Sequence, residues 1–140
     1  MKKEYVGKCY EVVETADQVF IGNDFPAELK GSEDTKRLCG ANAKAKANAT
    51  QKIPTLLKCA TNKRWQENFK GKHKVDAKYG WYRFTTRFAL PVYSSDLKEV
   101  ERFNIYRIEM LIRHAADGNL YLYDMVNIKK ETESVKYWTC

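Results

Sequence analysis

Long apolar segments are missing from this chain of 140 residues. No run approaches the roughly 18 apolar residues that a membrane-spanning helix needs. No apolar segment follows Lys2 and Lys3, as it would in a secretory signal. We therefore expect a soluble protein that has no membrane partner.

Cysteine pairs at metal-binding spacing are also missing. No Cys-x-x-Cys occurs, and neither His73 nor His114 stands at ligand spacing from a cysteine. We predict reduced, mostly buried thiols, which suit a cytosolic protein, with a zinc site assembled in three dimensions as the alternative. No metal or other cofactor is predicted. The scattered cysteines are Cys9, Cys39, Cys59 and Cys140.

Several catalytic motifs are absent as well. There is no Gly-rich phosphate loop, no Gly-x-Ser-x-Gly elbow and no His-Glu-x-x-His helix. The chain therefore lacks the signatures of P-loop nucleotide hydrolases, serine hydrolases of the elbow type and zinc proteases. What is present is ordinary globular composition, 44% hydrophobic and 31% charged, which predicts one domain over residues 1–140.

Positive charge is concentrated in the middle of the chain. Between Lys36 and Lys78 there are twelve Lys and Arg residues but only two acids, Glu67 and Asp76, a local excess of +10. The net charge is +7, so the remainder carries −3. Such a block attracts a polyanion such as RNA. The alternative is a well-solvated helical surface.

The N-terminal half predicts a hairpin followed by helices. Cys9–Val13 and Val19–Ile21 are β-prone runs, and Gly22–Gly31 is typical of a loop. Ser32 is a good N-cap for a helix running to about Ala49. Its inner face would be Leu38, Ala41, Ala45 and Ala49, with Lys44 and Lys46 elsewhere on its surface.

A second helix is predicted to begin at Pro54, because proline is favoured in a first helical turn. Trp65 and Phe69 do not share its apolar face, so we expect a break near residues 61–63 and a short helix that ends before Gly71. The apolar face of the second helix is Ile53, Leu56, Leu57 and Ala60.

From Tyr79 onward the apolar period changes to two, which predicts an antiparallel sheet of at least three strands. With the helices before it, this sheet makes the fold class α+β. The strands are residues 81–90, Phe103–Arg113 and Leu120–Lys130, and the last two are joined through Ala116-Asp117-Gly118.

Apolar matching favours a three-residue loop that ends in a left-handed Gly118 over a two-residue turn. In that register Asp124 falls opposite Met110 on the buried side, where it is the one awkward residue. The expected cross-strand pairs are Ala115–Asn119, Ile112–Leu122, Ile108–Val126 and Tyr106–Ile128.

The opposite face of the sheet is expected to be cationic and aromatic, with one carboxylate. Glu109 is a candidate base for the RNA 2′-hydroxyl, and arginines suit phosphate contacts. His73, between Lys72 and Lys74, is the candidate acid. Alternatively Glu109 only neutralises arginines, and His73 is an exposed loop residue. The face would carry Trp81, Arg83, Thr85, Arg87, Arg107, Glu109, Arg113, Tyr121, Tyr123 and Lys129, with the tyrosines and Trp81 stacking unpaired bases.

Several stretches, covering residues 9–132, resemble a domain of large polyvalent and MuF-type proteins from phages and mobile elements of Gram-positive bacteria. Such domains are grouped with the toxin-nuclease superfamily that includes barnase, EndoU, colicin and RelE folds. The tail 133–140 does not match. The stretches are residues 44–49, 60–64, 76–84, 87–92, 113–114, 120–124 and 128–132.

The resemblance implies helices before an antiparallel sheet and a metal-independent ribonuclease acting in the cytoplasm of a bacterial host. Its partners would be RNA, tRNA included, and an immunity or host defence protein. The alternative is a non-catalytic counter-defence module. Candidate catalytic residues are His73, Arg83, Arg87 and Glu109, with Thr132 carried over less closely; candidate nucleic-acid contacts are Lys44, Lys46, Lys72, Lys74, Trp81, Arg107, Arg113, Tyr121, Tyr123 and Lys129.

Overall fold

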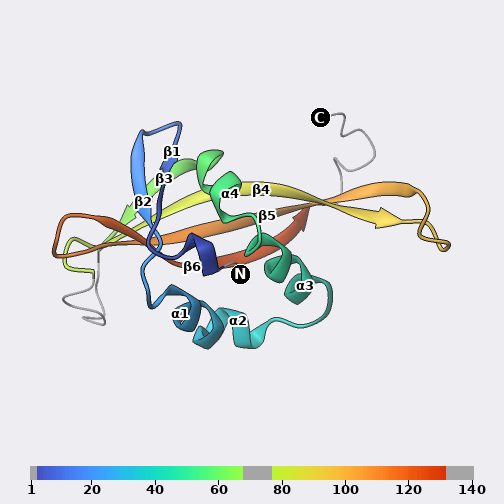
Figure 1. Ribbon diagram of the computed structural model, residues 1–140, viewed down its shortest axis with the longest axis horizontal. Helices are drawn as coiled ribbons and strands as arrows, with labels where there is room; N and C mark the ends of the chain where they lie inside the picture. Colours follow the sequence, from blue (N-terminus) through green and yellow to red (C-terminus); the bar gives the residue numbers. More distant parts are fainter. Residues whose placement is uncertain (1–2, 68–76, 132–140) are drawn as a thin grey trace.

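The computed structural model describes residues 3–67 and 77–131. The fold is α+β, as the sequence predicts, with an N-terminal hairpin, then helices, then a largely antiparallel sheet (Figure 1). No helix in these two ranges is both long and apolar enough to span a membrane. The elements are η1 (Lys3–Tyr5), β1 (Cys9–Val12), β2 (Asp17–Phe20), α1 (Phe25–Gly31), α2 (Glu33–Arg37), α3 (Gly40–Ala49), α4 (Ile53–Lys58), β3 (Thr61–Gln66), β4 (Trp81–Tyr93), β5 (Val100–His114) and β6 (Leu120–Glu131).

The strands form one six-stranded sheet in the order β1-β2-β6-β5-β4-β3. Neighbours are antiparallel except β2 and β6, which pair in parallel where Val19 lies opposite Leu120. The predicted N-terminal hairpin therefore extends the C-terminal sheet. The β4–β5 hairpin is longer than its neighbours, because β6 ends opposite Ile105, and Figure 1 shows it projecting beyond the rest of the sheet.

The core lies between the helices and one face of the sheet. The predicted apolar face of α4 is buried, and from β5 the alternate residues Ile108, Met110 and Ile112 are fully buried against the helices. Successive side chains of a strand point to opposite faces. The residues between them therefore lie on the other face, which we call the distal face and which carries Arg83, Glu109 and their cross-strand neighbours.

The β5–β6 turn has the predicted three-residue form, but the register beyond it differs. Gly118 has φ 85°, Ala115 N–H bonds to Asn119 O at 3.0 Å, and Ile112 lies opposite Leu122. Two register shifts then insert extra residues into β6. The predicted pairs Ile108–Val126 and Tyr106–Ile128 are therefore wrong; Glu109 lies opposite Val126 and Tyr106 opposite Lys130, while Asp124 faces Leu111 rather than Met110.

Two helical predictions need correction. The stretch predicted as the loop Gly22–Gly31 contains α1, because Pro26 fits the first helical turn and Phe25 and Leu29, one turn apart, are both buried. The helix predicted from Ser32 to Ala49 is two helices, since Leu38 is extended and Gly40 has φ 61°. Ser32 is the N-cap of α2, as predicted, and accepts a hydrogen bond from Thr35 N.

The short helix predicted after residues 61–63 is wrong, because Thr61–Gln66 form strand β3. β3 pairs with β4, with Trp65 opposite Tyr82. Cross-strand pairing and ladder hydrogen bonds override the weak local preference for helix. Residues 68–70 of that predicted helix lie outside the described ranges.

The cysteines also differ from expectation. Cys9, Cys39 and Cys59 are free, as predicted, but they are exposed rather than buried. Cys140 lies outside the described residues. Within the described part, no cluster of three or more His, Cys, Asp or Glu side chains is arranged to hold a metal ion.

Candidate functional site

A carboxylate surrounded by hydrogen-bond donors lies on the distal face. Glu109 projects from β5, and its side chain is 23% exposed. Its Oε2 accepts a bond from Arg64 Nη2 at 2.6 Å. Its Oε1 accepts bonds from Arg83 Nη1 at 3.0 Å and from Asn127 Nδ2 at 2.6 Å. The carboxylate is thus held as an anion between two guanidinium groups.

Sheet assembly brings these donors together from three strands. Arg83 on β4 is the cross-strand partner of Arg64 on β3, and Thr85 lies opposite Glu109. Arg83 therefore reaches Glu109 along a diagonal between neighbouring strands, a distance that long side chains span. Arg64 reaches Glu109 from β3, across β4. Asn127 stands on β6 at the second register shift, with φ 56°. No single segment of the sequence contains this cluster.

The surroundings of Glu109 favour its ionised form. Partial burial acts to raise its pKa, but the hydrogen bond from Asn127 and the charges of Arg83 and Arg64 outweigh burial. The pKa of Glu109 is therefore held below its ordinary value. A carboxylate with a lowered pKa stays ready to accept a proton down to acidic pH, although it is a weaker base than a free glutamate.

We expect Arg83→Gln to raise the pKa of Glu109, because the substitution removes a positive charge and a charged hydrogen bond. The measurement is a carbon-detected NMR titration of the side-chain carboxyls. Arg87→Gln is the matched control, since Arg87 bonds to Glu131 instead, at 2.7 Å. An unchanged Glu109 pKa in Arg83→Gln would contradict this view of the site.

The same lowered pKa links Glu109 to folding stability. A carboxyl whose pKa is lower in the folded than in the unfolded chain binds fewer protons when folded. The contribution of Glu109 to the free energy of unfolding is therefore complete above the pKa that Glu109 has in the unfolded chain. It is lost as pH falls through the pKa that Glu109 has in the folded protein.

A row of cations crosses the distal face beside Glu109. Arg87 on β4 lies opposite Arg107 on β5, and Arg107 lies opposite Lys129 on β6. Like charges directly opposite each other destabilise a sheet. Arg87 has an acidic partner in Glu131, which sequence analysis did not include in the face.

Aromatic side chains lie at the end of the distal face that is next to the β5–β6 turn. Trp81 and Tyr123 contact each other edge to face, with ring centroids 5.2 Å apart. The Arg113 guanidinium lies 4.6 Å from the centre of the Tyr121 ring. Arg113 and Tyr121 line a hollow of about 410 Å³ together with loop residues 22–24 and turn residues 115–117. The structure thus brings these four predicted contacts together, at a position four residues along β5 from Glu109.

Lys46 is not on the surface, contrary to the sequence-based expectation. Its side chain is only 4% exposed, and Nζ lies 2.8 Å from Asp34 Oδ2 and 3.0 Å from Asp124 Oδ1. The Lys46 ammonium is thus buried in ion pairs with Asp34 and Asp124 and does not contact RNA. It also explains Asp124, the awkward buried carboxylate. Lys44, two residues earlier on α3, is exposed as predicted.

Four of the candidate residues cannot be placed relative to Glu109. The proposed acid His73, its neighbours Lys72 and Lys74, and Thr132 all lie outside the described residues.

Sequence reasoning missed two of the donors that contact Glu109. Arg64 falls in the short helix predicted after residues 61–63, whereas its actual place in strand β3 sets it opposite Arg83. The contact of Asn127 with Glu109 could not be predicted from the sequence, because the orientation of Asn127 depends on a bulge in β6. Positive φ is uncommon in residues other than glycine, and asparagine is among the exceptions. The presence of an asparagine in the sequence does not by itself predict a positive φ.

No family model matches the chain, and searches among curated proteins and among solved structures likewise find no match. The resemblance to toxin nucleases therefore stays a prediction from sequence.

Proposed function

We propose that the protein is a metal-independent ribonuclease that binds RNA on the distal face of its sheet. The observation that carries the proposal is the Glu109 carboxylate, held ionised between Arg64 and Arg83 beside a cross-strand row of cations. A proton acceptor next to bidentate phosphate donors is what cleavage by the 2′-hydroxyl requires.

In this reaction Glu109 takes the proton of the 2′-hydroxyl, and the 2′-oxygen attacks the adjacent phosphorus. The bond from phosphorus to the 5′-oxygen breaks, leaving a 2′,3′-cyclic phosphate. The leaving 5′-oxygen takes a proton from the general acid, a role we assign to His73 on sequence grounds. Arg64 and Arg83 have further N–H donors that bind the non-bridging oxygens as negative charge develops.

Substrate binding would draw the arginines partly away from Glu109. A phosphate competes with the carboxylate for the same guanidinium donors, and lost contacts let the pKa of Glu109 rise toward its ordinary value. The base is then stronger in the complex than in the free protein. Neighbouring phosphates would lie along Arg87, Arg107 and Lys129, and unpaired bases near the aromatic end.

The test is incubation of the purified protein with total tRNA and with a mixed-sequence RNA in EDTA, followed by mapping of the new ends. We expect fragments that end in 2′,3′-cyclic phosphate. A matched oligonucleotide with a single 2′-deoxy residue at the cleavage site should stay intact. Intact RNA from a folded preparation, or cleavage of the 2′-deoxy substrate, would exclude this mechanism.

A second function, a non-catalytic module that binds nucleic acid or a host defence protein, has its own supporting observation. Both oxygens of Glu109 are already engaged by arginine, which suits a carboxylate whose role is to neutralise charge. Under this alternative, affinity depends on Arg87, Arg107 and Lys129, and Glu109→Gln leaves it undiminished. Salt-dependent binding of non-cleavable 2′-O-methyl RNA measures that affinity.

A further inference from the structure

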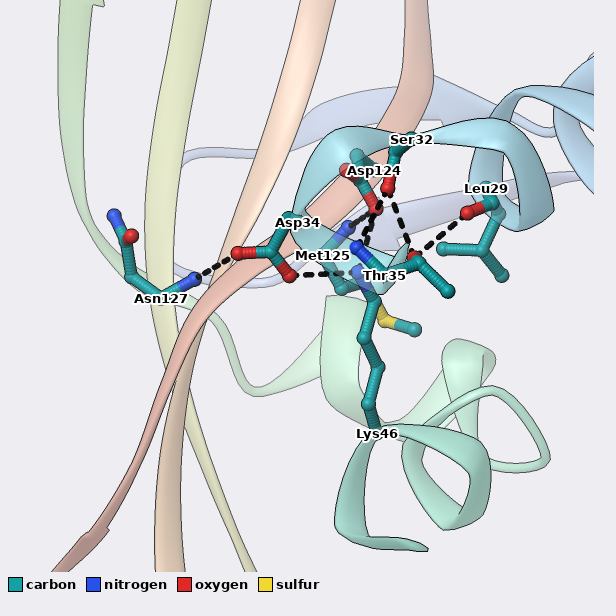
Figure 2. Close-up of polar contacts among 8 residues, drawn as sticks. All are labelled: Leu29, Ser32, Asp34, Thr35, Lys46, Asp124, Met125 and Asn127. Atoms are coloured by element: carbon teal, nitrogen blue, oxygen red, sulfur yellow. Dashed lines mark hydrogen bonds and ion pairs between the residues drawn. The ribbon is translucent and has the colours of Figure 1, made fainter. Parts of the chain in front are cut away.

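A buried ion cluster ties helices α2 and α3 to strand β6 (Figure 2). Lys46 of α3 sits between Asp34 of α2 and Asp124 of β6, and Asp124 also accepts a bond from the Met125 N–H at 2.8 Å. Burial raises the pKa of Asp124 even though the charge and hydrogen bond of Lys46 act to lower it. Lys46 and Asp124 are each only 4% exposed and Asp34 is 24% exposed, so the ion pairs that link the three elements lie largely away from water.

The cluster continues to the distal face through a single residue. Asp34 uses its second oxygen, Oδ1, to accept the backbone N–H of Asn127 at 3.3 Å (Figure 2). Asn127 has a left-handed backbone, φ 56°, at a β6 register shift. Its side-chain Nδ2 donates to Glu109 Oε1 at 2.6 Å. One residue thus has its backbone held by a helix and its side chain placed on the candidate base.

We propose that Asp34, itself fixed by Lys46, holds the Asn127 backbone so that its amide is aimed at the Glu109 carboxylate. Asn127 and Asp34 are then positioning residues. A left-handed asparagine at a bulge has neither a regular ladder nor a buried side chain to fix it, so the Asp34 bond supplies the restraint. The inference rests on the proposed function only for its effect on cleavage, not for the arrangement itself.

The first test is Asn127→Gly, which removes the amide but keeps a residue at ease with positive φ. We expect the pKa of Glu109 to rise, as measured by carbon-detected NMR titration. Leu97→Gly is the matched control, because Leu97 is also left-handed, with φ 60°, and lies exposed in the loop between β4 and β5, while the described donors to Glu109 are Arg64, Arg83 and Asn127. An unchanged Glu109 pKa in Asn127→Gly would overturn the proposal.

The second test is Asp34→Ala. The direction in which the pKa of Glu109 changes distinguishes loss of positioning from loss of a nearby charge. Loss of a nearby negative charge alone would lower the pKa of Glu109. Loss of positioning releases Asn127 and raises it. We expect a rise, and no further rise when Asp34→Ala is added to Asn127→Gly. Glu33→Ala on the same helix removes an exposed charge as the control; a fall in both variants would overturn the role of Asp34.

Cleavage assays test the catalytic consequence separately from the positioning role. If the protein is a ribonuclease, Asn127→Gly should lower kcat about 10–100-fold with KM little changed, since a misaligned base costs rate rather than binding. If the wild type cleaves no RNA, the proposed function fails, while the NMR titrations still decide the positioning role. An active wild type with full activity in Asn127→Gly would overturn the catalytic consequence.

Discussion

Glu109→Gln is expected to lower the rate of RNA cleavage about 10²–10⁴-fold, the range that a positioned general base contributes. Glutamine keeps the size of the side chain and an oxygen acceptor, but it cannot take the proton of the 2′-hydroxyl. Binding of non-cleavable RNA should be retained or slightly tighter, because a negative charge leaves a cationic face. The measurement is single-turnover cleavage beside equilibrium binding to 2′-O-methyl RNA.

Glu131→Gln is the matched control for that loss. Glu131 also lies beside the distal face, pairs with an arginine, Arg87, and is partly exposed like Glu109. The two variants change net charge equally, so a difference in cleavage rate between them does not arise from net charge. Equal cleavage rates in the two variants would contradict the role of Glu109 as a base and would favour the alternative of a non-catalytic binding module.

Lys46→Met is expected to destabilise the fold by about 3–5 kcal/mol, the cost of removing one partner from a buried ion pair. Methionine fills much the same volume, but it leaves Asp124 buried with 4% side-chain exposure and no ammonium beside it. The measurement is urea unfolding at neutral pH, followed by fluorescence. Lys44→Met on the exposed side of the same helix should change stability by less than about 0.5 kcal/mol.

Restoring charge balance should recover most of that loss. Asp124→Asn in the Lys46→Met background removes the more buried of the two carboxylates that lose the ammonium, but keeps an oxygen for the Met125 N–H. Replacing both members of a buried pair is often close to neutral. A double variant as unstable as Lys46→Met alone would show that Lys46 stabilises by packing and not by charge.

Local signals were sufficient where one rule decided the outcome. The Ser32 N-cap, the apolar face of α4 and the Gly118 turn were all predicted, because each depends on neighbours within a few residues. The alternation of Glu109 with buried Ile108 and Met110 was also predicted, since period two needs only one buried face.

Local signals failed where a partner distant in sequence decided the outcome. Arg64 lies in a strand because β4 provides its hydrogen-bonding partner, and its place beside Glu109 follows from that pairing. Lys46 looked like one more surface lysine, since nothing near it in sequence reveals the carboxylate of Asp124, 78 residues away.

The sequence by itself determined the fold class, the alternation of faces and the cationic character of the middle of the chain. These depend on composition and short periods, which are properties of the chain alone. Only the tertiary structure decided which charges are buried and which surround Glu109. Those outcomes depend on strand neighbours and on two bulges in β6, whose extra residues shift every side chain beyond them.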